Sequence, residues 1–420
     1  MTFDVLILSN GPGELSTWVR PVVQQLRSRY GSEVRVSLVL SPCPHATGQE
    51  LTIAQRFAGI DRFQAAEHFF PFLLWGKTQD SWDWDDRGVV VFLGGDQFFA
   101  VCLGKRLGYG IVVYAEWEAR WLPWVDRFGV MSPKVLQSIP TRYRSKVTIV
   151  GDLMADAALS CPHSAEASAV LEPTETIALL PGSKAAKLGL GVPLVLAIAD
   201  YVQQRRPHCR FWIPIAPTLT PEALAWYAQA DNNPLIPLIK GTTAHLITEG
   251  STFYLQTAAG VRVELADAFP LYDRLRSSLL AITTVGANTA ELGALGVPMI
   301  VLLPTQHLAV MRSWDGLPGL LARIPVLGNA LAATITARML QRKGLLAWPN
   351  LWAGKTIVPE LVGELTPSWV GDQVLDYLNH PEKLQTMQQA LREVRGTAGA
   401  AEQFVNLIDP FFRLTHPYNK

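Results

Sequence analysis

The segment FDVLILSNGPGELSTWVR, residues 3–20, decides the class of fold that we expect for this chain. Its first part, FDVLILS, is a short apolar run that is typical of a buried strand. The turn Ser9-Asn10-Gly11-Pro12-Gly13-Glu14 follows, and a helical pattern of apolar residues then covers 16–29. A strand, a glycine-rich turn and a helix in this order are typical of nucleotide-binding α/β proteins. The turn does not fit the pattern G-x-G-x-x-G, so it does not predict dinucleotide binding.

The composition indicates a chain with a large core. Its 420 residues suffice for two domains of ordinary size, and 49% of them are hydrophobic whereas 17% are charged. Lys plus Arg and Asp plus Glu both number 36, so no excess of positive charge points to a nucleic-acid partner. Scattered cysteines without C-x-x-C spacing predict reduced thiols in a cytoplasmic protein. These cysteines are Cys43, Cys102, Cys161 and Cys209.

We expect neither a signal peptide nor a membrane-spanning segment. Asp4 interrupts an N-terminus that already has the pattern of a strand. The longest apolar stretch, about residues 279–304, contains Asn288 and Glu291 and is broken by glycines. Such a stretch is too polar to cross a bilayer as a helix.

Strand-like and helical segments alternate along the chain in two series. The first series comprises FDVLILS, VRVSLVLS, GVVVFLGG, YGIVVYAE and VTIVGD, and the second comprises TIALLPGSK, CRFWIPIA, STFYLQ, SLLAITTVG and VPMIVLLP. In the second series we expect helices over 189–205, 264–278 and 287–296. Near-continuous apolar strands that alternate with helices indicate parallel sheets covered on both faces. We therefore expect an α/β fold with two doubly wound, Rossmann-like domains facing a cleft.

A polar, proline-containing segment separates the two series. We expect a first domain over 1–160, a linker over 161–175, a second domain over 176–400 and a tail over 401–420 that packs near the domain interface. Doubly wound sheets bind ligands at the carboxyl ends of their strands. The cleft between the domains is therefore where we expect the functional site.

Two turns in the second domain are suited to binding an anion. One strand runs into Pro181-Gly182-Ser183-Lys184, whose backbone N–H groups, hydroxyl and ammonium can face a phosphate. Another strand ends at Val285-Gly286, and a helix starts near Asn288 with Glu291 in its first turn. Such a helix N-terminus favours pyrophosphate, and the carboxylate can accept hydrogen bonds from ribose hydroxyls. The alternatives are an ordinary β–α turn at 181–184 and a helix-capping role for Glu291.

Asp96, in VVVFLGGDQFFA (89–100), is the candidate catalytic residue of the first domain. It follows a buried strand and two glycines, so we expect it at the carboxyl end of the sheet, where it can act as a general base. The alternative is that Asp96 caps the helix expected over 98–108. Asp83-Trp84-Asp85 has the spacing of a metal-binding D-x-D motif, but it precedes a strand and we interpret it as a solvated turn. We expect no metal site.

The segment HFFPFLLWGK (68–77) is rich in large apolar side chains. It can form part of the core, or it can form a patch that enters a membrane interface or lines a lipid channel. The residues of this candidate membrane or lipid patch are Phe69, Phe70, Phe72, Leu73, Leu74 and Trp75.

Several segments, taken in order, resemble motifs of the lipid-A-disaccharide synthase family. They are FLGGDQFFAVCLGKRLGYGIVVYAEWEARW, IVGDLMAD (149–156), LLPGSK, ANTAELGALGVPMIV and AWPNLWAGKTIVPELVGE (347–364). Their shared order is more specific than any single motif. The resemblance implies a GT-B fold and an inverting glycosyltransferase that uses a UDP-activated, acylated glucosamine donor, needs no metal or other cofactor and associates peripherally with a membrane. It also allows a homodimer.

The resemblance assigns roles to residues that match the family's motifs. Asp96 matches the catalytic aspartate, Glu291 matches the glutamate of the donor-binding helix, and the patch at 69–75 matches a membrane-facing surface. Lys184 stands where the family usually has arginine. The UDP-sugar-binding residues expected on this basis are Gly182, Ser183, Lys184, Gly286, Asn288, Thr289, Glu291 and Asn350.

The chain departs from the family's pattern on the acceptor side. The first turn usually reads Ser-Gly-Glu-Ala-Ser-Gly-Asp, and the family's Val-Gly-His-Pro is here Val150-Gly151-Asp152-Leu153. We expect Asn10, Gly11, Gly13 and Glu14 to serve the acceptor, with the alternative that this turn only connects the strand to the helix. The glycines let the backbone approach a ligand closely, and Glu14 can contact hydroxyls or balance the helix end.

The resulting expectation is transfer of an acylated amino sugar or hexose from a UDP-sugar to a lipid-linked sugar acceptor, at the cytoplasmic side of a membrane. Two alternatives stay open. One is a UDP-sugar 2-epimerase on the same fold, which needs no acceptor. The other is a non-catalytic, membrane-peripheral protein that binds a lipid or a UDP-sugar.

Overall fold

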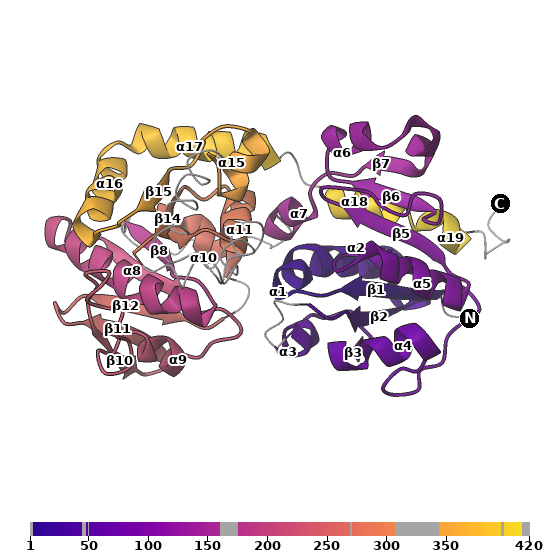
Figure 1. Ribbon diagram of the computed structural model, residues 1–420, viewed down its shortest axis with the longest axis horizontal. Helices are drawn as coiled ribbons and strands as arrows, with labels where there is room; N and C mark the ends of the chain where they lie inside the picture. Colours follow the sequence, from indigo (N-terminus) through magenta and orange to yellow (C-terminus); the bar gives the residue numbers. More distant parts are fainter. Residues whose placement is uncertain are drawn as a thin grey trace, which may run out of the picture. The chain divides into compact units, whose positions relative to one another are not determined.

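The computed structural model describes residues 3–43, 48, 50–159, 175–268, 271–306, 344–395 and 399–413. The chain forms two compact units (Figure 1). Unit 1 comprises Met1–Pro162 together with Gly396–Lys420, and unit 2 comprises His163–Arg395. Most of the expected linker at 161–175 lies outside the described residues, as does Cys161.

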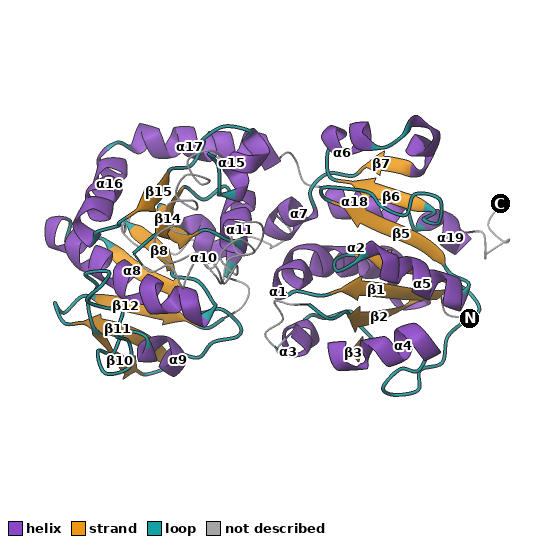
Figure 2. Cartoon of the chain, in the orientation of Figure 1, coloured by secondary structure: helices purple, strands orange, loops and turns teal. Residues whose placement is uncertain are grey.

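The described part of unit 1 contains a seven-stranded sheet in the order β3-β2-β1-β4-β5-β6-β7, and every pair of neighbours is parallel. Every residue of β1 and β4 is buried, so helices cover both faces of the sheet, as Figure 2 shows. The strands are β1 (Phe3–Ser9), β2 (Val34–Leu40), β3 (Arg62–Gln64), β4 (Gly88–Phe92), β5 (Gly110–Ala115), β6 (Arg127–Val130) and β7 (Val147–Ile149).

The helices of unit 1 come from both ends of the chain. The α-helices are α1 (Pro12–Glu14), α2 (Arg20–Tyr30), α3 (Glu50–Gln55), α4 (Phe69–Trp75), α5 (Gln97–Leu107), α6 (Pro133–Ser138), α7 (Leu153–Leu159), α18 (Ala400–Asn406) and α19 (Asp409–Arg413). The 3-10 helices are η2 (Gly31–Glu33), η3 (Ala66–His68) and η4 (Thr141–Lys146). The π-helix η1 (Leu15–Val19) joins α1 to α2, so the helix after the first turn is widened at its start. Such widened turns are frequent at functional sites.

The last described helices of the chain pack on unit 1, beside β5 and β6 in Figure 1. Asp156 of α7 accepts hydrogen bonds from the backbone N–H groups of Gly399 and Ala401, at 2.6 and 2.5 Å, and so caps the start of α18. Phe404 is fully buried against Tyr114, with ring centroids 5.9 Å apart. Residues 396–420, which the sequence assigns in part to a tail, are thus a structural part of unit 1 where they are described.

The described part of unit 2 contains an eight-stranded sheet in the order β10-β11-β12-β9-β8-β13-β14-β15. Six neighbouring strands are parallel, whereas β10-β11 and β11-β12 pair in antiparallel fashion. The strands are β8 (Thr176–Leu180), β9 (Arg210–Pro214), β10 (Ala244–Glu249), β11 (Thr252–Thr257), β12 (Arg262–Ala266), β13 (Leu280–Thr284), β14 (Met299–Pro304) and β15 (Glu360–Gly363). The α-helices are α8 (Ala185–Arg205), α9 (Pro221–Trp226), α10 (Tyr272–Ser277), α11 (Ala287–Leu295), α15 (Trp348–Ala353), α16 (Pro367–Asn379) and α17 (Pro381–Arg395).

One of the helices predicted from the sequence is not found in the structure. The range 264–278 contains the end of β12 and the separate helix α10. Val263 and Leu265 of β12 are buried, and pairing with β9 and β11 on either side satisfies the backbone of this strand. The tertiary pairing therefore overrides the local helical pattern.

Helix α8 is the core helix of unit 2. It is the one helix among the described residues that is long and apolar enough to cross a membrane, with a mean hydropathy of 1.6, but 78% of its apolar window is buried. Its residues Leu188, Leu194 and Ile198 belong to the same apolar cluster as Ile177 of β8 and Ile282 of β13. Packing against its own sheet accounts for its apolar composition.

Candidate functional site

In both units the predicted turns lie at a topological switch point. In unit 1 the chain order of the strands reverses between β1 and β4, and in unit 2 it reverses between β8 and β13. Loops that leave adjacent strands in opposite directions at such a point open a crevice at the carboxyl ends of the strands. The predicted turns follow these four strands: 9–14 follows β1, 94–96 follows β4, 181–184 follows β8 and 285–288 follows β13.

The 181–184 turn of unit 2 leads directly into α8. Gly182 has φ +109°, a left-handed conformation that side chains disfavour, so glycine is required for this turn. Lys184 is the N-cap residue of α8, and its side chain makes no capping hydrogen bond. Ser183 is exposed. The N-terminal end of α8, with its partial positive charge, therefore lies beside a serine hydroxyl and a lysine.

The second turn of unit 2 has the same construction. Gly286 has φ +151° and is the N-cap residue of α11, so no side chain caps this helix from that position. Asn288 is half-buried in the first helical turn. Thr289 is buried, its hydroxyl donates to the carbonyl of Gly286 at 2.8 Å, and it accepts a hydrogen bond from the N–H of Trp348. In this structure Thr289 holds the turn together, and its expected contact with a ligand stays a prediction.

Glu291 lies in the second turn of α11, because the helix begins at Ala287. The expectation that it lies in the first turn is wrong, because Glu291 is the fifth residue of the helix and lies just beyond that turn, too far along to cap the helix start. Helical side chains generally point back toward the N-terminus, a direction that suits a ligand contact at the helix start. Burial raises the pKa of Glu291, and a hydrogen bond with Tyr272 acts in the opposite direction.

Asn350 has a structural role in place of the expected contact with a ligand. It is fully buried in α15, and its side-chain amide donates to the carbonyl of Val358 and to the carboxylate of Glu360. Its side-chain oxygen accepts from the N–H groups of Ile357 and Val358. All four hydrogen bonds that an asparagine side chain can make are used within unit 2, so Asn350 positions the segment leading to β15.

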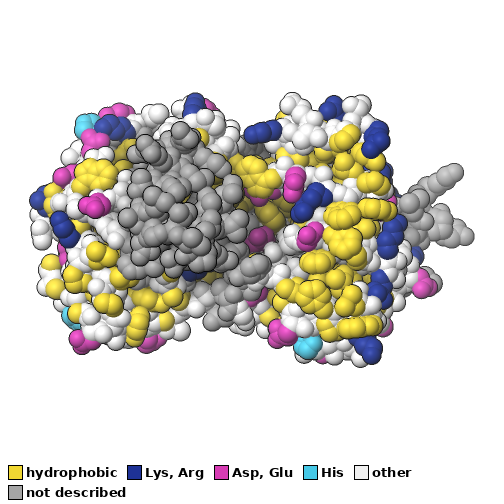
Figure 3. Space-filling view, in the orientation of Figure 1, with side chains coloured by type: hydrophobic (Ala, Val, Ile, Leu, Met, Phe, Trp, Pro, Cys, Tyr) yellow, Lys and Arg dark blue, Asp and Glu magenta, His cyan; other side chains and the backbone are white. Residues whose placement is uncertain are grey.

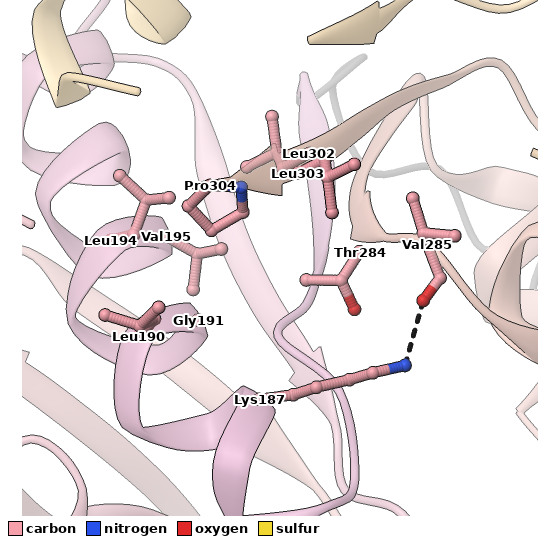
Figure 4. Close-up of a pocket in the computed structure, with 10 residues that line it drawn as sticks. All are labelled: Lys187, Leu190, Gly191, Leu194, Val195, Thr284, Val285, Leu302, Leu303 and Pro304. Atoms are coloured by element: carbon pink, nitrogen blue, oxygen red, sulfur yellow. Dashed lines mark hydrogen bonds between the residues drawn. The ribbon is translucent and has the colours of Figure 1, made fainter. Parts of the chain in front are cut away.

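Lys187, which sequence reasoning overlooked, reaches the second turn from the first. Its Nζ donates to the carbonyl of Val285 at 2.9 Å (Figure 4). It also lines a mostly apolar pocket between α8 and the ends of β13 and β14. The other lining residues are Leu190, Gly191, Leu194, Val195, Thr284, Val285, Leu302, Leu303 and Pro304. A lysine in the first helical turn after a candidate anion-binding loop is the sequence signal that could have identified it.

The candidate acceptor residues of unit 1 lie together around a second pair of turns. Backbone and side chains are packed so closely here that a Cβ on Gly94 would lie 3.0 Å from Oδ1 of Asn10 and 3.3 Å from Cγ of Glu14. A Cβ on Gly11 would clash with the carboxylate of Glu14. Oδ1 of Asn10 is buried and accepts no hydrogen bond from the residues that the structure describes. At the switch point of unit 1, polar side chains therefore lie in close contact with the backbone of glycine turns.

Asp96 is the N-cap residue of α5, as the structural alternative predicted. Its Oδ1 accepts a hydrogen bond from the N–H of Phe98 at 2.9 Å. The carboxylate is only partly buried, and its cap fixes the orientation of the side chain next to Gly95. The neighbouring Gln97 is buried and binds the backbone of Glu118 and Arg120, so it ties the aromatic segment after β5 to this turn.

The structure divides the apolar segment at 69–75. Phe69 and Phe72, one helical turn apart on α4, are fully buried against the sheet and do not belong to an exposed patch. Phe70, Leu74 and Trp75 on the other side of the helix are 49%, 54% and 65% exposed, and Leu73 is half-buried. Hydrophobic side chains cover the face of unit 1 over α4 and α5 in Figure 3.

The described residues contain no cluster of three or more His, Cys, Asp or Glu side chains that could hold a metal ion. Asp83 of the D-x-D segment is largely exposed and forms ion pairs with Arg35 and Arg62. The hydrogen bond from Arg35 lowers the pKa of Asp83. Cys43, Cys102 and Cys209 are thiols, with no disulfide among the residues that the structure describes.

Comparison with solved structures defines the class of fold. The chain is similar to a UDP-GlcNAc 2-epimerase from Neisseria meningitidis bound to UDP-GlcNAc, with a TM-score of 0.53 at 13% identity over 97% of this chain and all of that one. A second UDP-N-acetylglucosamine 2-epimerase gives a TM-score of 0.54 at 11% identity over 100% of this chain and 98% of that one. These similarities establish a GT-B fold, the α/β architecture with two Rossmann-like domains that the sequence predicted.

Comparison with curated proteins gives relatives by sequence, although no family model matches the chain. A lipid-A-disaccharide synthase from Anaeromyxobacter sp. (strain K) is 27% identical over 225 residues, 53% of this chain and 45% of that protein. One from Syntrophus aciditrophicus is 24% identical over 286 residues, which are 66% of this chain and 61% of that protein. One from Geobacter metallireducens is 24% identical over 293 residues, which are 68% of this chain and 62% of that protein. The chain spans about half of the length of these relatives. They confirm the resemblance to the lipid-A-disaccharide synthase family.

Proposed function

We propose that this protein is an inverting glycosyltransferase that moves an amino sugar or hexose, acylated or not, from a UDP-sugar to a lipid-linked sugar acceptor. The observation that carries the proposal is the similarity in sequence to lipid-A-disaccharide synthases. The paired turns at the two switch points support it, because a transferase of this fold needs one site for a donor and one for an acceptor.

Unit 2 is the proposed donor domain. The turns that contain Gly182 and Gly286 each present a helix N-terminus, which favours a diphosphate. Ser183, Lys184 and Asn288 lie in these turns and would contact the phosphates, while Glu291 would accept hydrogen bonds from the ribose hydroxyls. Fixed positive charge in these turns would stabilise the departing UDP.

Unit 1 is the proposed acceptor domain, with Asp96 as the general base. Its carboxylate would accept the proton of an acceptor hydroxyl while the hydroxyl oxygen forms a bond to the anomeric carbon of the sugar. The bond from this carbon to the phosphate oxygen breaks with its electron pair, and UDP leaves. The acceptor attacks opposite to the leaving group, so the configuration at the anomeric carbon inverts. Asn10 and Glu14 would orient the acceptor hydroxyls.

A lipid acceptor requires contact with a membrane surface, and unit 1 offers a candidate surface for it. Phe70, Leu74 and Trp75 are exposed on α4, and Arg106 donates a hydrogen bond to the carbonyl of Leu74 at 2.7 Å. Aromatic side chains beside a cation favour the interface of an anionic bilayer. We propose a cytoplasmic protein that binds the membrane peripherally through this surface.

The main rival is a UDP-sugar 2-epimerase, because solved epimerases share the fold of the whole chain. Similarity of fold does not determine the reaction. A second rival is a binding protein without catalytic activity. The three proposals differ in one observable: only the transferase releases UDP in proportion to the acceptor that is supplied.

Substitution of Asp96 tests the catalytic proposal. We expect Asp96→Asn to lower acceptor-dependent UDP release by about 10²- to 10⁴-fold, the range typical of general-base catalysis, and to leave the Kd for UDP unchanged. Asparagine is as good an N-cap residue as aspartate, so the variant keeps the cap of α5 and its stability. The measurement is a coupled assay of UDP release with a membrane lipid extract as acceptor.

Asp96→Ala is the matched control, because it removes both the carboxylate and the cap. It should lose the same activity and in addition about 1 kcal/mol of stability. Asp96→Asn that retains wild-type turnover would exclude Asp96 as the base, and wild-type protein that releases no UDP with any acceptor would favour the rivals.

A further inference from the structure

The side chain of Lys187 lies between the two glycine turns of unit 2. A Cβ on Gly182 would lie 3.0 Å from Cβ of Lys187, so the base of the side chain packs against the first turn. A Cβ on Gly286 would lie 3.1 Å from Nζ, so the ammonium packs against the second. Its hydrogen bond to the carbonyl of Val285 fixes this position (Figure 4).

The surroundings of Lys187 increase the effect of its charge. The pocket beside it is lined mainly by aliphatic side chains of α8 and β14, among them Leu190, Leu194 and Leu302. Coulomb interactions are stronger next to such a surface than in open water, because the local dielectric is lower. The ammonium also lies beside Gly286, the N-cap residue of α11, so its charge adds to that of the helix end.

We propose that Lys187 is the cation that binds the diphosphate of the nucleotide, and that it holds the two turns together before the nucleotide arrives. This inference rests on the proposed function, since it assigns a residue to the same donor site. The sequence motif points to Lys184, which occupies the N-cap position before α8, whereas Lys187 is the lysine whose ammonium contacts the second turn.

The physical reason is preorganisation. The hydrogen bond to Val285 ties the loop after β13 to the start of α8, so the backbone N–H groups of both turns keep their positions in the free protein. A site that is already arranged loses little free energy to ordering when the anion binds. When UDP leaves, the same charge stabilises the negative charge that develops on its phosphate.

The test compares nucleotides that differ only in their phosphates. The Kd values of UDP, UMP and uridine are measured by calorimetry for the wild-type protein and for Lys187→Gln, Lys187→Arg and Lys355→Gln. We expect Lys187→Gln to weaken UDP binding by about 10- to 100-fold and to leave uridine binding unchanged, because a hydrogen bond to a charged group is lost. Its UDP affinity should also depend less on salt concentration than that of the wild type. Lys187→Arg keeps the charge and should lie between the two.

Lys355→Gln removes one exposed positive charge from the same unit and should bind UDP as the wild type does. Unchanged UDP affinity in Lys187→Gln, or an equal loss for UDP and uridine, would overturn the role of Lys187 and leave the proposed function standing. Wild-type protein that binds uridine and UDP equally weakly would overturn the donor site itself, and this inference with it.

Discussion

Among the proposed site residues, Glu291 is the clearest case of a side chain whose burial lowers the stability of the folded protein. Burial raises its pKa, so the charged form is disfavoured in the folded state. A carboxyl group with a raised pKa contributes most to stability when it is protonated. Its contribution therefore falls as the pH rises from the ordinary glutamate pKa through the raised value. An ionisable group kept at such a position suits a residue that serves a ligand.

We expect Glu291→Gln to raise the Tm at pH 7 and to weaken UDP binding at the same pH. The gain in stability should vanish at low pH, where the wild-type side chain is also protonated, and the difference in UDP affinity should vanish there too. Thermal denaturation and calorimetry across pH 4–8 measure both effects. A variant that gains stability and binds UDP as tightly as the wild type would show that Glu291 does not contact the ribose.

For single residues, the sequence predicts where a site residue lies better than it predicts what its side chain contacts. Motifs single out Lys184, Thr289 and Asn350, and all three lie in or next to the turns of unit 2. The structure shows that Thr289 and Asn350 use their hydrogen bonds within the protein. A motif records that a residue type is required, but it does not distinguish contact with a ligand from support of the backbone that makes the contact.

At the scale of the elements, the proposed donor site depends on the close approach of α8 to the turn that precedes it. Gly191 of α8 packs against the backbone carbonyl of Pro181, where a side chain would clash with that oxygen. Close packing of a helix on the loop that precedes it requires glycine at the contact. Gly191 lies outside the 181–184 motif, yet it is the residue that allows α8 to pack closely against this turn.

Two glycines of α8 allow a matched test of this contact. We expect Gly191→Ala to destabilise unit 2 and to weaken UDP binding, because the new Cβ meets rigid backbone. Gly189→Ala places its Cβ 3.2 Å from the flexible end of Leu235, so it should be tolerated and can gain up to about 1 kcal/mol from the helix propensity of alanine. Urea denaturation and UDP titration measure both variants. Equal behaviour of the two variants would contradict the proposed packing.

The alternation of apolar strands and helices suffices to predict the parallel part of each sheet. It fails where pairing across the sheet decides the structure. The range 264–278 has a helical pattern interrupted by Pro270, and its first residues form β12 because β9 and β11 provide partners on both sides. The antiparallel ribbon of β10 and β11 was predicted only as the single strand STFYLQ, since short strands carry a weak periodic signal.

At the scale of the whole molecule, the chain returns to unit 1 after completing unit 2. Phe404 of α18 fills space beside Gly129 of β6, where a Cβ would lie 2.6 Å from the phenyl ring. Tyr30 of α2 donates a hydrogen bond to Asp409, and Phe412 packs on Phe3 of β1. The final helices are thus part of the core of unit 1, so the stability of this unit depends on residues far along the chain.

We expect Phe404→Ala to destabilise unit 1 by about 3–5 kcal/mol, the usual cost of removing a buried aromatic side chain. Calorimetry of the full chain should show a lower Tm for the transition of unit 1 and little change for that of unit 2. Gln403→Ala, an exposed position on the same helix, serves as the control and should change neither. A uniform shift of both transitions would contradict the assignment of α18 to unit 1.

The sequence predicts two units, but it does not predict on which of them the C-terminal helices pack. Amphipathic helices such as α18 show an apolar face without naming its partner. Asp156, inside the motif IVGDLMAD, caps the start of α18 by accepting a hydrogen bond from the N–H of Gly399, which lies 243 positions further along the chain. Contacts of this length leave no local pattern, and only the folded structure identifies them.

The most direct test of the proposed glycosyltransferase activity is to follow the sugar itself. UDP-sugars labelled in the sugar, with and without acyl chains, are incubated with the protein and a membrane lipid extract, and the organic phase is then analysed. We predict that label enters a lipid product together with an equal amount of released UDP, and that NMR shows an inverted anomeric configuration in that product. Label that stays in the aqueous phase, either as an epimer of the UDP-sugar or as the unchanged donor, would contradict the assignment of a glycosyltransferase.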